Sequence, residues 1–76
     1  MQITIRLVGM LRLDRFKQRA FDVPEGASVS ETLKELSVSL EQMKICLVSI
    51  NGKRSKLDAV LKSGDVLEAF LPVGEG

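Results

Sequence analysis

The chain ends in the stretch LPVGEG (71–76), where glycine, proline and one carboxylate side chain are the chemically distinctive residues. Two glycines and a proline within six residues do not suit a packed core, because ordering glycine costs entropy and proline lacks a backbone N–H. The stretch directly follows an apolar segment of strand length. We therefore expect residues 1–70 to form the folded domain and residues 71–76 to form a flexible tail that inserts into a partner.

Side chains that commonly perform catalysis are scarce. There is no histidine, so no imidazole base or ligand is available, and a single cysteine cannot build a structural zinc site. Neither G-x-G-x-x-G nor G-x-x-x-x-G-K-[ST] is present. Cys46 lies in an apolar run and is interpreted as a small buried hydrophobic residue. These absences favour a carrier, subunit or binding module over an enzyme, and we expect no metal or cofactor bound by the chain itself.

Composition indicates a small globular domain. The 76 residues are 45% hydrophobic and 28% charged, with a formal net charge of +1. This balance, and the lack of Tyr and Trp for base stacking, argue against a nucleic-acid partner. No apolar run approaches the roughly 20 residues of a membrane span, and Met1 leads into a strand-like pattern without a secretory leader. With only one cysteine, the expected location is the cytoplasm.

The elements that must position the tail begin with a hairpin. Residues 2–8 alternate between apolar and polar side chains, as a half-buried strand requires. Residues 19–23 form a second strand after a loop, which predicts an antiparallel pair.

A helix is predicted next. Ser28 and Glu31 form an S-x-x-E capping box at its start, and we expect the helix to end near Ser37. Residues 38–44 are expected to form a connector with one short helical turn. The apolar stripe that should pack against the hairpin consists of Val29, Leu33 and Leu36.

The second half of the chain returns to strands. Residues 45–50 (ICLVSI) are nearly all apolar and predict a central strand, and Asn51-Gly52 is a strong turn signal. Residues 53–56 are polar and predict a short edge strand or a loop. A last strand is expected at 66–70.

Alternation along the last strand decides which side chains face the core. Glu68 should face water, which places Leu67, Ala69 and Leu71 on the buried side. Phe70 then has two alternatives: it is exposed or at a rim beside the tail, or it is tucked into the edge of the core. An exposed aromatic residue beside a tail would mark a partner surface.

The order of these elements is that of an α+β fold of the β-grasp, or ubiquitin-like, type. In this fold a mixed sheet of four to five strands packs on one main helix. Across its whole length the sequence resembles the MoaD/ThiS family of sulfur carriers, and it resembles MoaD, the small subunit of molybdopterin synthase, more closely. The segments that carry the resemblance are RLVGMLR (6–12), VPEGASVSETLKEL (23–36), SINGK (49–53), LKSGDVLEAF (61–70) and LPVG (71–74).

The resemblance implies a role for the last residue. In this family an ATP-dependent activating enzyme of the MoeB/ThiF type adenylates the carboxylate of the terminal glycine, which is then converted to a thiocarboxylate. The sulfur is delivered into molybdopterin or, for ThiS, into the thiamin thiazole. Gly76 holds the reactive position here, and ATP and magnesium are expected only at the partner enzyme. The implied sulfur acceptor is the large subunit of molybdopterin synthase or another enzyme, and the free chain is expected to be monomeric.

Glu75 departs from the Gly-Gly ending of the family. It adds a side chain, and its charge lies near the incoming triphosphate. At about 6 Å and an effective dielectric constant of about 20, the repulsion is roughly 3 kcal/mol. Two hypotheses stay open. The chain is a sulfur carrier activated at Gly76, for molybdopterin, thiamin or another route, or it is a β-grasp interaction module whose tail only docks.

Basic side chains form two clusters that suit an acidic partner surface, although solvation is the simpler interpretation. We assign Phe70 and Arg54 to the expected partner interface. The clusters are Arg12, Arg15, Lys17 and Arg19, and Lys53, Arg54, Lys56 and Lys62.

Overall fold

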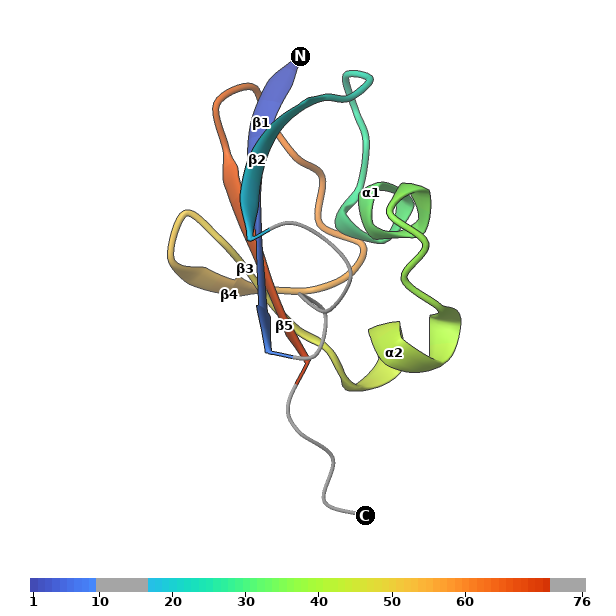
Figure 1. Ribbon diagram of the computed structural model, residues 1–76. Coiled ribbons are helices and arrows are strands. Elements are labelled where there is room, and N and C mark those ends of the chain that lie inside the picture. Colours follow the sequence, from blue (N-terminus) through green and yellow to red (C-terminus); the bar gives the residue numbers. More distant parts are fainter. Residues whose placement is uncertain (10–16, 72–76) are drawn as a thin grey trace.

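The computed structural model describes residues 1–9 and 17–71. In these residues one five-stranded sheet is covered on one face by two helices (Figure 1). The strands are β1 (Gln2–Gly9), β2 (Gln18–Asp22), β3 (Leu47–Ile50), β4 (Lys53–Ser55) and β5 (Val66–Leu71). The helices are α1 (Val29–Glu35) and α2 (Leu40–Ile45).

The strands are ordered β2-β1-β5-β3-β4 across the sheet. β1 pairs with β2 in antiparallel fashion, which confirms the predicted hairpin, and it pairs with β5 in parallel. β3 lies antiparallel to both β5 and β4, so β4 is the predicted short edge strand. The strand predicted to be central, β3, lies inside the sheet between β5 and β4, and the middle position of this mixed sheet is held by β5.

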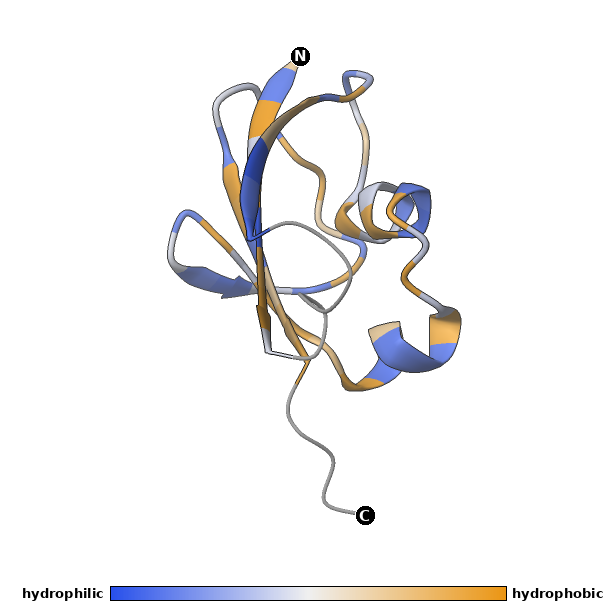
Figure 2. Cartoon of the chain, viewed as in Figure 1, coloured by the Kyte–Doolittle hydropathy of each residue, from blue (hydrophilic) through white to orange (hydrophobic). Residues whose placement is uncertain are grey.

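The core lies between the sheet and the helices. Hydrophobic and hydrophilic residues alternate along much of β1 and β5 (Figure 2), and the buried apolar residues of these two strands face the helices. Leu33 is fully buried, which confirms the expected contact face of α1. The core cluster is Ile3, Ile5, Leu7, Val29, Leu33, Val38, Met43, Val48, Leu61, Leu67, Ala69 and Leu71.

The start of α1 follows the predicted capping box, and its end comes slightly earlier than expected. The backbone N–H of Glu31 donates to Ser28 Oγ at 3.2 Å, and the N–H of Ser28 donates to Glu31 Oε1 at 2.9 Å. The helix ends at Glu35 with Leu36 as its C-cap. Ser37 has a φ of 67°, a left-handed conformation that stops the helix.

Two predicted boundaries were wrong. The short helical turn expected within residues 38–44 is present as the helix α2, which a second capping box between Ser39 and Gln42 starts and which runs one residue further than expected. Because α2 runs to Ile45, β3 begins only at Leu47 and not at residue 45. At the other end of the domain, Leu71 was assigned to the tail but is the last residue of β5 and is buried.

A set of side-chain hydrogen bonds from Asn51 and Asp65, which we call the bracket, holds the start of β5. Asn51, in the turn after β3, has a φ of 53° and donates from Nδ2 to Asp65 Oδ1 at 2.9 Å. Its Oδ1 accepts the backbone N–H of Val66 at 2.8 Å. Asp65 Oδ2 also accepts the N–H of Lys62 at 2.8 Å. These bonds tie the turn after β3 to the strand that leads to the C-terminus.

Candidate partner-docking site at the base of the C-terminal tail

The face of the sheet opposite the helices carries three apolar side chains beside the last described residue. Val8 on β1 and Leu47 on β3 are both direct cross-strand partners of Phe70 on β5. Cross-strand partners lie on the same face of a sheet, so the three side chains form one strip, which we call the tail-base patch. Leu47 is 39% exposed, and Val8 and Phe70 are partly buried. The patch is apolar and accessible from solvent.

Phe70 therefore follows the first of its two predicted alternatives. It lies on the outer face and is not a member of the core cluster. Its ring is supported by Gly9, the last residue of β1. A Cβ at Gly9 would lie 3.0 Å from Phe70 Cε1 and 2.7 Å from the carbonyl oxygen of Leu71. The ring thus lies against bare backbone, which only glycine provides.

Sequence reasoning did not identify Gly9 as part of this site. Its φ of +70° is in the left-handed region that favours glycine. The available signal was a glycine that ends a regular alternation at residue 9. That signal indicates a strand end but not which side chain lies over it.

A polar row borders the patch on the same face. Arg6 pairs across the sheet with Glu68, Glu68 with Ser49, and Ser49 with Arg54. The guanidinium of Arg6 lies 3.7 Å from the Glu68 carboxylate, and both side chains are partly exposed, so this ion pair adds little stability. Arg54 is exposed on β4. The fold thus brings both residues of the expected interface, Phe70 and Arg54, to one face, with an apolar centre and a charged border.

The basic residues of the described chain lie toward opposite edges of the sheet. Lys53 and Arg54 are on β4, whereas Arg19 is on β2, where its guanidinium lies 5.1 Å from the ring centroid of Phe21. The two clusters therefore do not form one surface. Outside the described residues are Arg12 and Arg15 and the expected tail residues Pro72, Val73, Gly74, Glu75 and Gly76.

Cys46 packs against the core between α2 and β3 but is only partly buried. Burial raises the pKa of its thiol above the ordinary value, and a hydrogen bond with the Phe70 backbone offsets part of this rise. A thiol with a raised pKa stays protonated at neutral pH and is a poor nucleophile. This environment agrees with the interpretation of Cys46 as a small hydrophobic residue.

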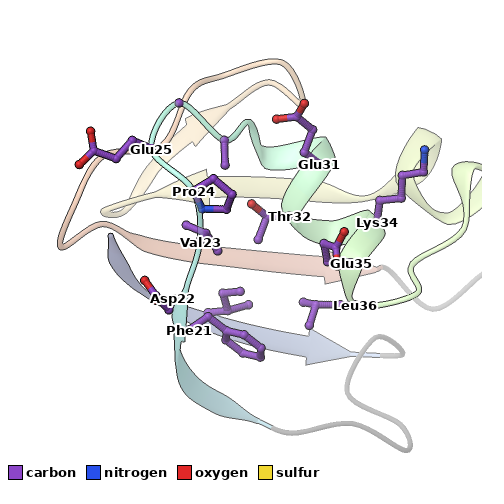
Figure 3. A pocket seen from close by; sticks show the side chains of 13 residues that line it. Phe21, Asp22, Val23, Pro24, Glu25, Glu31, Thr32, Lys34, Glu35 and Leu36 are labelled. Atoms are coloured by element: carbon purple, nitrogen blue, oxygen red, sulfur yellow. The ribbon is translucent and has the colours of Figure 1, made fainter.

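A groove of about 1160 Å³ lies on the helix side, between α1 and the end of β2 with the turn that follows (Figure 3). Phe21, Val23 and Leu36 line its apolar part. The charged residues of its lining are four carboxylates and one lysine: Asp22, Glu25, Glu31, Glu35 and Lys34.

The described residues offer neither a metal-binding cluster nor a membrane-spanning helix. Within residues 1–9 and 17–71, no group of three or more His, Cys, Asp or Glu residues is placed to hold a metal ion. No helix in this part of the chain is long and apolar enough to cross a membrane.

Comparison with known proteins identifies the family. The ThiS family model matches residues 5–76, and no curated protein matches the chain. Three solved structures each cover 100% of this chain and are themselves covered over 100% of their length. SAMP1 from Haloferax volcanii is 21% identical, with a TM-score of 0.76. A chain in the complex of subunits 1 and 2 of molybdopterin-converting factor from Helicobacter pylori is 21% identical, with a TM-score of 0.65.

The third structure is the thiamine biosynthesis protein (ThiS) from Geobacter metallireducens, which is 25% identical, with a TM-score of 0.64. The structural similarities agree on the fold, and the family match spans both the tail-base patch and residue 76. The chain therefore belongs to the ThiS family, the ubiquitin-like sulfur carriers that include MoaD-type proteins.

Proposed function

We propose that this chain carries sulfur on the C-terminal carboxylate of Gly76. The observation that carries the proposal is the family match, which runs through residue 76. In the first step, a partner enzyme transfers the adenylyl group of ATP to the carboxylate, and pyrophosphate leaves. In the second step, a sulfur donor displaces AMP and leaves a thiocarboxylate. The partner supplies ATP, magnesium and sulfur, so the chain acts as a carrier in the cytoplasm and not as an enzyme.

The tail-base patch is the proposed docking surface for these partners. Phe70 lies on the outer face, and the next residue, Leu71, is anchored in the core. Five residues follow Leu71, and a fully extended chain spans at most about 3.6 Å per residue. The carboxylate of Gly76 therefore reaches at most about 18 Å beyond the anchored strand end. A partner that holds Phe70 must place its reactive centre within this distance.

For the pathway, we propose molybdopterin-type cofactor synthesis, with the large subunit of molybdopterin synthase as the sulfur acceptor. The segments that resemble MoaD and the similarity to the Helicobacter pylori complex support this route. The similarity to ThiS from Geobacter metallireducens supports the thiamin thiazole as the alternative. The neighbouring genes distinguish the two. A gene for a large synthase subunit indicates the pterin route, and a gene for a thiazole synthase indicates thiamin.

Mass spectrometry tests the loading of Gly76. After incubation with ATP, an activating enzyme and a sulfur source, the change from OH to SH adds about 16 Da, which methionine oxidation would also add. Trypsin removes this ambiguity, because Lys62 is the last basic residue and peptide 63–76 contains neither Met nor Cys. We expect the gain on this peptide, and no gain without ATP or after deletion of residues 74–76. A lack of gain in the intact chain, with partner binding retained, would instead identify a docking module.

Glu75 provides a second test of the same site. If its charge opposes loading by roughly 3 kcal/mol, Glu75→Gly should load up to about 100-fold faster. Glu75→Gln separates charge from size, since it keeps the side chain and removes the charge. Loading that is unchanged in both variants would show that the partner accommodates this carboxylate.

Truncating the Phe70 side chain tests whether partners dock on the tail-base patch. Replacing Phe70 with Ala should weaken binding to the activating enzyme by about 30-fold or more, the usual effect of a central aromatic residue. The matched control is Val60→Ser, because Val60 is 57% exposed and apolar but lies outside the patch. If Phe70→Ala lowers the melting temperature without weakening binding more than the control, the docking role is refuted.

A further inference from the structure

The outer edge of β2 presents backbone N–H and C=O groups that pair with no strand formed by residues 1–9 and 17–71. The N–H of Leu7 donates to Lys17 O at 2.9 Å, and the N–H of Val23 donates to Met1 O at 2.8 Å. In an antiparallel ladder the bonded residues alternate, so the odd-numbered residues of this segment bond to β1. The even-numbered residues Gln18, Ala20 and Asp22 point their backbone N–H and C=O groups away from β1. In the described part of the chain no strand pairs with that edge, because β2 is the first strand of the sheet.

Charge is distributed unevenly along this edge. Lys17 and Arg19 lie at the beginning of the segment. Glu25 and Asp22 lie at its end, where the N-terminal ammonium of Met1 lies 3.2 Å from Asp22 Oδ1. Ala20, in the middle, is small and uncharged. Two such segments in antiparallel orientation place the basic half of each opposite the acidic half of the other. The edge is therefore complementary to itself in charge.

We propose that β2 pairs in antiparallel fashion with β2 of a second copy of this chain, centred on Ala20. In this register Ala20 faces its own counterpart, and Gln18 faces Asp22 of the second copy on both sides. Gln18, Ala20 and Asp22 are the three residues of β2 whose backbone N–H and C=O groups point away from β1. Each of the three pairs exchanges two hydrogen bonds, so about six bonds form and the two sheets become continuous.

The side chains on the helix side fit the same register. Arg19 and Phe21 pair with the buried Ile5 and Ile3, so both lie on the face toward α1. In the dimer Arg19 faces Phe21 of the second copy, and a cation over an aromatic face is already the arrangement within one chain, at 5.1 Å.

The acidic groove of Figure 3 lies along this edge. In the proposed register, Lys17 of the second copy faces Val23, which lines the groove. From α1, Glu31 and Glu35 supply negative charge and Lys34 supplies one positive charge, so the carboxylates of the lining outnumber its ammonium group. This charge pattern favours the basic half of a second copy as the occupant and disfavours an acidic peptide.

The proposed pairing is weak and leaves the docking surface open. A single pair of five-residue strands buries less than the standard interface of about 1,600 Å², so we expect a dissociation constant on the order of 0.1 mM. At lower concentrations the chain is monomeric, as the sequence analysis expects. The outer face with Phe70 is not covered by pairing at the edge, because β1 separates β2 from β5.

Cross-linking at defined positions tests the register. In a Cys46→Ser background, Ala20→Cys places two thiols on residues about 5.5 Å apart between Cα atoms. Gln18→Cys is the matched control, because its two copies are four residues apart, or about 13 Å. A short bismaleimide should link Ala20→Cys into dimers, leave Gln18→Cys mostly monomeric, and link Gln18→Cys to Asp22→Cys when the two are mixed. Equal yields for Ala20→Cys and Gln18→Cys would overturn the register.

A dilution series tests the pairing without cross-linking. Between about 1 mM and about 0.02 mM, the amide resonances of Gln18, Ala20 and Asp22 should shift, because the occupied fraction of such a dimer changes strongly in this range. Ala20→Pro removes an outward N–H and no bond within the chain, so it should abolish the shifts of the two flanking amides while the fold persists. Amides that do not move with concentration in the unmodified chain would refute the proposal.

Discussion

Replacing Gly9 with Ala is the sharpest test of how the tail-base patch is built. Gly9 has a φ of +70°, and an added Cβ would lie 2.7 Å from the carbonyl oxygen of Leu71 and 3.0 Å from Phe70 Cε1. Real Cβ atoms essentially never approach heavy atoms to less than 3.0 Å. The Leu71 oxygen belongs to backbone at the end of β5, so it moves only if the pairing of β1 with β5 shifts.

Two effects lower the free energy of unfolding in Gly9→Ala. Placing a side chain in the left-handed region costs about 1–2 kcal/mol. Overpacking at a rigid site adds about 1–3 kcal/mol. We therefore expect Gly9→Ala to lower the free energy of unfolding by about 2–5 kcal/mol in total. At about 4–8 °C per kcal/mol for a domain of this size, the melting temperature should fall by at least about 8 °C.

Urea denaturation of Gly9→Ala and Gly26→Ala separates the cost of the left-handed conformation from the cost of overpacking against β5. Gly26 has a φ of +86°, and an added Cβ there meets nothing within 4 Å. The control thus carries only the conformational cost of about 1–2 kcal/mol, and the difference between the variants measures the contact with β5. Equal costs for the two variants would show that the close approach of Gly9 to Phe70 and Leu71 does not constrain the fold.

The remaining predictions concern the core, the bracket and the thiol. Leu33→Ala should cost about 2–5 kcal/mol by denaturation, because the side chain is fully buried, and a cost under about 0.5 kcal/mol would contradict the packing of α1 on the sheet. Asn51→Ala leaves the N–H of Val66 and the Asp65 carboxylate without this partner and should cost about 1–3 kcal/mol, whereas an unchanged urea midpoint would show that the bracket is dispensable. Because the pKa of Cys46 is raised in the folded chain, iodoacetamide should alkylate it more slowly at pH 8 than in urea-unfolded chain, and equal rates would contradict its burial. The same shift stabilises the fold below the ordinary thiol pKa, and this contribution should be lost as pH rises through the folded value and be absent in Cys46→Ser.

Local signals in the sequence were sufficient for much of the fold. Alternation placed the core-facing residues of β1 and β5 correctly, and the capping box of Ser28 and Glu31 fixed the start of α1. These features depend on residues a few positions apart, where backbone geometry and burial act directly.

The end of α2 shows where local reasoning failed, because a short helical turn was expected within residues 38–44 but Ile45 was assigned to the next strand. The capping signal from Ser39 to Gln42 was present, but the helix buries only Met43. Leu40 and Ile45 are 71% and 58% exposed, so no apolar stripe marked a helix, and the apolar run that contains Ile45 indicated a strand. Exposed apolar residues misled the periodicity argument, because periodicity presumes that apolar residues are buried.

The tail-base patch required information that only the fold supplies. Phe70 and Val8 are 62 positions apart in the sequence, and they become neighbours because β5 inserts beside β1. Alternation correctly placed Phe70 on the outer side of its strand. It did not show that Leu47 and Val8 flank it, because cross-strand register is set by pairing between distant segments.

The central position of β5 also bears on how the protein is synthesised. Among the strands formed by residues 1–9 and 17–71, the middle strand is the last in the sequence, so its neighbours β1 and β3 have no partner on that side until residues 66–71 have left the ribosome. Pairing it with β1 closes a loop of most of the chain, so completion of the fold is a late and comparatively slow event. A nascent or truncated chain that lacks residues 66–71 loses Leu67, Ala69 and Leu71 from its core. The tail-base patch therefore forms only after residues 66–71 have been made, because Phe70 joins Val8 and Leu47 when β5 pairs with β1 and β3.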